Sequence, residues 1–216
     1  PSIDSNETYG GASALDLQGT TDMFQSFEDS ASPEQGPDRL AALRVEMERA
    51  GLDAFLVPRA DAHQGEYVAP RDSRLAWLTG FTGSAGWCVA LADRAGVFVD
   101  GRYRVQVRAQ VADVFDRVDW PEVSLGEWIA QALPKGVIGF DPWLVSVDQL
   151  RTLENQLETH ELHASANLVD AIWFDQPAAP MGAIFAQPLD LAGEAHGDKI
   201  TRLATALNAQ AAVITL

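Results

Sequence analysis

Apolar residues change their spacing repeatedly from Asp38 onward. One helix face is predicted by residues three and four positions apart, namely Leu40, Leu43 and Met47. Asp38 follows a proline and belongs to the residue types that cap a helix at its amino end. After Gly51 comes the short apolar run Ala54–Val57, which Pro58 ends. The pattern therefore predicts a helix that begins at Asp38 and a buried strand after it.

The same alternation continues as far as residue 166. The further predicted elements are a helical turn over Arg74–Leu78, strands over Gly86–Leu91 and Gly96–Val99, a helix near Tyr103–Val111, a strand near Val114–Val118, a helix after Ser124, a strand over Val137–Phe140, a helix after Ser146 and a strand over His160–Ala166. Ser124 and Ser146 stand three residues before Glu127 and Gln149, which is the spacing of a capping box. Because the two consecutive strands joined at Asp93 form a hairpin, the fold class is α/β with a mixed sheet flanked by helices.

Four segments differ in composition. Residues 1–37 lack an apolar period, and we expect them to be a leader or disordered tail. Residues 1–22 are either an addition to the native protein or a disordered tail of it. Residues 38–176 form the first domain, and residues 177–197, which begin with Pro177 and Pro180, form a linker. Residues 198–216 repeat the opening unit, with Asp198, Ile200, Leu203 and Leu207 ahead of the apolar run Val213–Leu216. The repeat predicts the truncated start of a second domain of similar fold.

The charge of the chain excludes two classes of partner. Asp and Glu number 31 against 15 Lys and Arg, which gives a net charge of −16. Such a surface repels nucleic acid phosphates and anionic membranes, so we expect neither as a partner. No apolar stretch is long enough to span a membrane and no signal peptide is visible. The single cysteine, Cys88, lies in an apolar strand and is interpreted as a buried, inert thiol of a cytoplasmic protein.

The chain carries no motif for a self-sufficient active site. It has no His-Glu-x-x-His sequence, no phosphate-binding loop with lysine, no Gly-x-Ser-x-Gly elbow and no dinucleotide fingerprint. Its four histidines are scattered, at His63, His160, His163 and His196. We therefore predict neither a catalytic residue nor a metal ligand in this chain.

Two loops nevertheless hold more special residues than a scaffold needs. Residues 58–74 place many charged side chains directly after a buried strand, where α/β sheets bind ligands, although such charges can also pair among themselves. Residues 79–86 contain three glycines and fit a closely packed turn better than a phosphate site. In the tetrapeptide Asp100-Gly101-Arg102-Tyr103, the glycine allows a sharp turn and the aspartate is expected to cap the helix that follows.

Taken in order, these segments resemble a known family. Residues 57–70, residues 74–86 and Asp100–Tyr103, together with Asn167–Trp173 and the prolines that follow, are similar to the amino-terminal region of Xaa-Pro aminopeptidases (aminopeptidase P) of the larger cytosolic type. The resemblance implies a creatinase/prolidase amino-terminal fold that is used twice before a catalytic domain. That domain would bind two divalent metal ions, usually manganese, through two Asp, one His and two Glu, and would release the first residue from peptides with proline second. None of those ligands can be placed in this sequence, so no cofactor is expected in it.

The family also implies a role for this part of the protein. Its first domain limits access to the active site and supports a homodimer, which makes six residues candidates for a surface facing the substrate cleft or the other subunit: His63, Glu66, Arg71, Arg74, Trp77 and Phe81. Trp77 and Phe81 fit equally well as core residues. Two other readings stay open: a stand-alone, non-catalytic module of the same fold that binds a peptide or protein, and a creatinase- or prolidase-like parent acting on other substrates.

Overall fold

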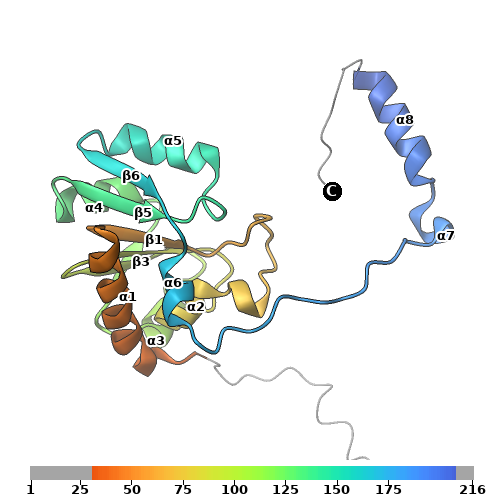
Figure 1. The fold of residues 1–216 in the computed structure, drawn as a ribbon. Helices are drawn as coiled ribbons and strands as arrows, with labels where there is room; N and C mark the ends of the chain where they lie inside the picture. The colour runs from red at the N-terminus through yellow and green to blue at the C-terminus, as the bar shows by residue number, and fades with distance from the viewer. Residues whose placement is uncertain (1–30, 208–216) are drawn as a thin grey trace, which may run out of the picture. The chain divides into compact units, whose positions relative to one another are not determined.

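The computed structural model describes residues 31–207 (Figure 1). The elements are the 3-10 helices η3 (Pro33–Gln35) and η4 (Pro70–Asp72), the helices α1 (Gly36–Ala50), α2 (Arg74–Thr79), α3 (Gln106–Gln110), α4 (Leu125–Ala132), α5 (Val147–Gln156), α6 (Leu168–Ile172), α7 (Leu189–Ala192) and α8 (His196–Leu207), and the strands β1 (Ala54–Pro58), β2 (Trp87–Leu91), β3 (Ala95–Val99), β4 (Asp116–Asp119), β5 (Gly136–Phe140) and β6 (His160–Ala164). Contacts within the chain divide it into two compact units after Gln176.

The first unit is built on one six-stranded mixed sheet in the order β4-β3-β2-β1-β5-β6. Strand β2 runs antiparallel to both of its neighbours, β1 and β3, and every other pairing is parallel. The predicted α/β class with a mixed sheet is confirmed, and the hairpin is its source. Since the other five strands point the same way, their carboxyl ends meet at one edge of the sheet, which we call the carboxyl edge.

Helices cover both faces of this sheet, α1, α2, α3 and α6 on one side and α4 and α5 on the other (Figure 1). Strand β1 shows why two layers are needed, because all five of its residues are buried. Phe55 and Val57 belong to the core beneath α1, whereas Ala54 and Leu56 belong to the core beneath α4 and α5. Alternate side chains of a strand point to opposite faces, so a continuous apolar run requires cover on both.

The helix starts follow the sequence in part. Ser146 and Gln149 form the complete capping box of α5, as predicted. Ser124 accepts a hydrogen bond from the Glu127 backbone N–H at the start of α4. The prediction for Asp38 is wrong: α1 begins at Gly36, directly after η3, and Asp38 lies inside its first turn. An acidic residue there still favours the helix, because it lies near the positive end of the helix dipole.

The prediction that Asp100 caps the following helix is also wrong. Helix α3 begins only at Gln106. The Asp100 Oδ1 atom instead accepts the backbone N–H of Arg102 at 2.9 Å. Aspartate often bonds the backbone two residues onward in this way, which stabilises a turn in place of a helix start.

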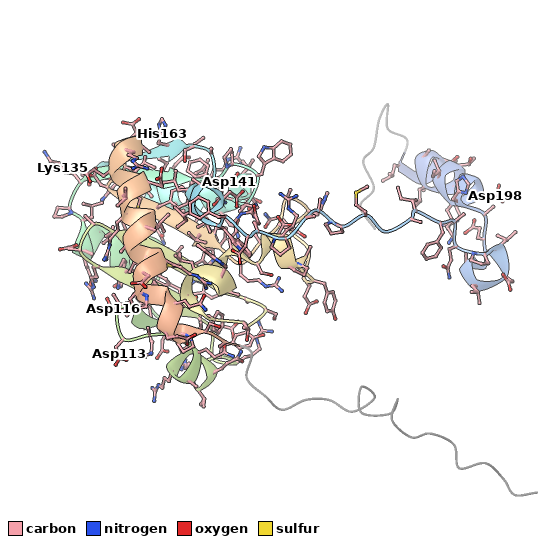
Figure 2. The ribbon with its side chains drawn as sticks, turned by 60° about the horizontal axis from the view of Figure 1, so that its bottom comes forward. Asp113, Asp116, Lys135, Asp141, His163 and Asp198 are labelled. Atoms are coloured by element: carbon pink, nitrogen blue, oxygen red, sulfur yellow. The ribbon has the colours of Figure 1, made fainter. Side chains whose placement is uncertain are left out.

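The second unit contains α7 and α8 within the part of the chain that the structure describes. Helix α8 covers the helix predicted after Asp198, which lies in its first turn and is labelled in Figure 2. Ile200 and Leu207 are more than half exposed on this helix. The strand predicted over Val213–Leu216 lies outside the described residues.

Burial makes Cys88 an inert thiol, as the sequence indicated. The residue is fully buried in β2, and this burial raises the pKa of its thiol to about 12. Since the thiolate is the reactive species, we expect the folded chain to react with an aromatic disulfide reagent at pH 8 at least about 1000-fold more slowly than the urea-unfolded chain. Stopped-flow absorbance measures both rates. Rapid stoichiometric labelling of the folded chain would contradict this assignment.

None of the helices in the described part of the chain is both long and apolar enough to cross a bilayer.

Candidate functional site

Several loops of the first unit meet at the carboxyl edge. The segments that follow β1, β3 and β5 all leave the sheet there, and β2 enters it. Figure 2 shows Asp141, directly after β5, far from Lys135 at the other end of the strand. A pocket of about 290 Å³ lies at this edge and is lined by Pro58, Arg59, Ala60, Gln64, Gly65, Glu66, Ser84, Ala85, Gly86, Trp87, Trp120 and Gln149. In α/β sheets this is the edge where ligands commonly bind.

The loop after β1 is held in shape by its own polar groups. Asp61 Oδ1 accepts the backbone N–H of His63 at 2.9 Å and that of Gly65 at 3.0 Å. Partial burial raises the pKa of Asp61, but these two hydrogen bonds, together with the nearby charges of His63 and Arg59, hold the pKa below its ordinary value. Arg59 Nη1 donates to the Glu66 carbonyl at 2.7 Å. These hydrogen bonds hold the backbone of the loop in one shape and leave the side chains of His63 and Glu66 exposed to solvent.

His63 and Glu66, two of the six predicted site residues, lie on this loop and are exposed. Glu66 lines the pocket at the carboxyl edge, and Tyr67 beside it is 92% exposed. Among residues 31–207 there is no group of three or more His, Cys, Asp or Glu that could hold a metal ion. The described residues thus do not fit a dinuclear metal centre, and we derive no chemical step through one.

Arg71, Arg74 and Trp77 lie elsewhere, where α2 and η4 pack against α6. Arg74 is 5% exposed, and its guanidinium donates to both carboxylate oxygens of Asp170, at 2.6 and 2.9 Å, and to Asp72 at 3.0 Å. The Trp77 ring stacks on Trp173 with 5.2 Å between ring centroids. These contacts join two helices, so they account for Arg74 and Trp77 without a ligand.

Arg71 contributes to the packing of η4 against α6 through its backbone. Its carbonyl accepts a hydrogen bond of 2.8 Å from the Gln176 side chain, which also donates to Asp170 at 2.9 Å. The last residue of the first unit is thereby tied to both η4 and α6.

Phe81 is fully buried, so the core alternative applies to it and a position facing a cleft is excluded. Its ring meets Tyr103 edge to face, with 5.5 Å between centroids. A Cβ atom on Gly83 would lie 2.2 Å from the Phe81 ring, which explains why that position is glycine. The glycine-rich segment is therefore the closely packed turn that the sequence favoured.

The tetrapeptide after β3 secures this turn. Tyr103 Oη lies 2.6 Å from Ser84 Oγ, and this hydrogen bond lowers the pKa of Tyr103. Arg102 folds back onto the Asp100 carboxylate at 2.7 Å, and this hydrogen bond lowers the pKa of Asp100. Gly101 is exposed and a Cβ atom there would meet nothing within 4 Å, so the turn does not require glycine at this position. The structural role proposed for the four residues fits these contacts, although the cap does not form.

Sequence reasoning missed the residues that other elements bring to the carboxyl edge. The residues that line the pocket there include Trp87, Trp120 and Gln149. Trp143, three residues after the end of β5, is 75% exposed. Gln64 Nε2 donates to the Leu144 carbonyl at 3.1 Å, across 80 residues of sequence. Tryptophans directly at strand ends were the available signal, since bulky aromatic residues at such ends often border a binding site.

Comparison with known proteins gives the family of these features. Residues 39–172 match the model of the creatinase/prolidase N-terminal domain. The chain is 37% identical to Xaa-Pro aminopeptidase 2 of Rattus norvegicus over 176 residues, which is 76% of this chain and 25% of the relative. It is 38% identical to aminopeptidase P1 of Lotus japonicus over 162 residues, 70% of this chain and 24% of the relative. The chain thus spans about a quarter of the length of these curated relatives.

Two solved structures are similar in fold to this chain. X-prolyl aminopeptidase from Caenorhabditis elegans, described as a cytosolic enzyme with a di-nuclear active site, superposes with a TM-score of 0.74 at 28% identity over 80% of this chain and 31% of its own. The N-terminal domain of the cytoplasmic peptidase PepQ from Mycobacterium tuberculosis superposes with a TM-score of 0.51 at 27% identity over 62% of this chain and 98% of its own.

Proposed function

The chain belongs to the creatinase/prolidase N-terminal domain family, and from this premise we propose that it is the amino-terminal part of an Xaa-Pro aminopeptidase. The parent protein would release the first residue from peptides whose second residue is proline. The observation that carries the proposal is the 37% identity to Xaa-Pro aminopeptidase 2 of the rat over 76% of this chain. Because the match covers only a quarter of the rat enzyme, we assign the activity to the longer parent protein and not to this chain.

We further propose that this part is not catalytic and that it limits access to the active site and supports a homodimer. The exposed loop with His63 and Glu66, placed beside a pocket at the carboxyl edge, supports a surface that other parts of the protein or the substrate can contact. The di-nuclear active site of the C. elegans enzyme supports two divalent metal ions in the parent, with manganese as the expected metal. A cytoplasmic location is proposed on the same relative, which is cytosolic.

A peptidase assay tests the proposal. The 216-residue chain and the full-length gene product are each incubated with a peptide that begins Ala-Pro, with and without added manganese, and the released alanine is quantified. We expect manganese-dependent release by the full-length protein and none above background by this chain. Release by this chain would refute its non-catalytic role, and a full-length protein that fails on every Xaa-Pro peptide would refute the family activity.

The alternative is a stand-alone binding module of the same fold. The PepQ N-terminal domain, solved with almost nothing else in its chain, supports only that such a domain can form without a catalytic domain, since it is itself part of a peptidase. Such a module predicts a full-length gene product that lacks peptidase activity under all metal conditions of the assay above.

A further inference from the structure

A second pocket continues the one at the carboxyl edge. It measures about 190 Å³ and lies between α4 and α5, lined by Trp87, Trp120, Ser124, Leu125, Gln149, Thr152, Leu153 and Gln156. Trp87, Trp120 and Gln149 line both pockets. We call the two together the tryptophan cleft. None of the six residues that the family resemblance made candidates for a cleft-facing or intersubunit surface lines the part between α4 and α5.

Hydrogen-bond donors of this cleft are left free. Gln149 uses its Oε1 atom to accept the Ser146 backbone N–H at 2.8 Å, which leaves its side-chain NH2 group without a partner among the described residues. The indole N–H groups of Trp87 and Trp120 likewise donate to no group in that part of the chain. Both indoles can reach solvent, since the one buried side-chain nitrogen without a hydrogen bond in residues 31–207 is Arg104 Nε. A ligand that accepts hydrogen bonds is therefore favoured.

The charged side chains of the tryptophan cleft, Arg59 and Glu66, both line its part at the carboxyl edge. None of the eight residues that line the part between α4 and α5 is charged, although the chain carries a net charge of −16. Trp87 and Leu125 are nearly buried and belong to the core beneath α4 and α5, so the floor of this part is apolar. An uncharged ligand with apolar rings and exposed carbonyl oxygens complements such a surface.

We propose that the tryptophan cleft binds a proline-rich, extended segment of a peptide. Proline has no backbone N–H, so a run of prolines offers carbonyl acceptors and no donors. It also adopts a polyproline II helix in free solution, with its carbonyls unpaired and its rings exposed, and such helices dock into grooves lined by aromatic side chains. The inference rests on the proposed function in one respect only, that the bound segment belongs to a substrate and lies downstream of its cleaved bond.

The test uses the 216-residue chain, a hexaproline peptide blocked at both ends, and a blocked Gly-Ser peptide of equal length. Neither peptide has a free amino terminus, so neither is a substrate for an aminopeptidase, and binding is separated from catalysis. Among the six tryptophan indole N–H signals in a proton–nitrogen NMR spectrum, we expect two to shift saturably with hexaproline and none with Gly-Ser. Unchanged spectra at millimolar hexaproline, or equal shifts with both peptides, would overturn the proposal even if the parent cleaves Xaa-Pro bonds.

Gln149→Glu separates a binding role from a structural one. Glutamate at this position keeps the oxygen that completes the capping box of α5 but replaces the free NH2 donor with an acceptor. We expect unchanged thermal unfolding and a dissociation constant for hexaproline raised about tenfold or more. The matched control is Gln131→Glu, the same change at an exposed position of α4 outside the cleft, which should bind like the original chain.

Trp120→Phe provides a second variant, because it keeps an aromatic ring and removes only the indole N–H. An intermediate loss of affinity is expected. Wild-type affinity in both Gln149→Glu and Trp120→Phe would show that these donors do not hold the peptide, and the assigned site would be wrong.

Discussion

Replacing Phe81 with alanine is expected to lower the free energy of unfolding by about 3–5 kcal/mol, the range found when a buried phenylalanine is truncated. The Phe81 side chain is fully buried and packs edge to face on Tyr103. It also fills the space over Gly83 and Gly86, where a Cβ atom would lie 2.2 and 3.1 Å from ring atoms. These backbone segments belong to one tight turn, so the cavity cannot close by a small side-chain movement, and the loss should lie at the upper end.

Urea unfolding of the 216-residue chain, followed by circular dichroism, measures the change in the first unit. Phe174→Ala is the matched control, because this phenylalanine is 95% exposed and its removal should leave stability within about 0.5 kcal/mol. A Phe81→Ala variant as stable as the control would show that Phe81 is not part of the core and would reopen its assignment to a surface.

Arg74→Ala should give the second-largest loss, about 2–3 kcal/mol. The guanidinium is 5% exposed and makes three hydrogen bonds to Asp170 and Asp72, so its removal leaves two carboxylates without their cation. The side chains of Asp170 and Asp72 are 34% and 22% exposed. Water can therefore replace part of the hydrogen bonding that their carboxylates lose with the guanidinium. For this reason the expected loss is smaller than that for a completely buried pair.

Two variants accompany Arg74→Ala in the same unfolding experiment. Arg74→Lys keeps the charge but loses the two-pronged contact with Asp170, so an intermediate stability is expected. Arg102→Ala breaks the exposed pair with Asp100 and should have no measurable effect. If Arg74→Ala instead retains full stability while the full-length protein loses peptidase activity or dimers, the residue serves the cleft or interface, as the family resemblance suggested.

Local patterns along the chain were sufficient for most of the elements. The apolar run at β1, the hairpin of β2 and β3 and the capping box of α5 are encoded within a few neighbouring residues, because strand alternation and helix capping depend on sequence spacing. The two errors fall at helix starts, at Asp38 and Asp100. Aspartate is a common capping residue, but spacing alone does not say whether the helix begins before it, as at Asp38, or whether it stabilises a turn instead, as at Asp100.

The candidate site was harder to predict for a related reason. The loop after β1 was recognised by its charges, and two of its residues, His63 and Glu66, remain exposed. Arg74 and Phe81 were grouped with them by the family resemblance, which says nothing of their contacts in this chain. The structure separates them, since Arg74 pairs with Asp170, 96 residues further on, and Phe81 points into the core. Pairing across such a distance leaves no local signal.

The sequence by itself determined the α/β class, the family and the absence of known catalytic motifs, because spacing, composition and motif are properties of neighbouring residues. Only the tertiary structure decided which polar residues serve the scaffold and which line a cleft. Trp87, Trp120 and Gln149 come from three separate segments, and they meet because the fold brings the start of β2, the end of β4 and the start of α5 to one edge. The physical reason is that burial and hydrogen-bond pairing are settled by neighbours in space.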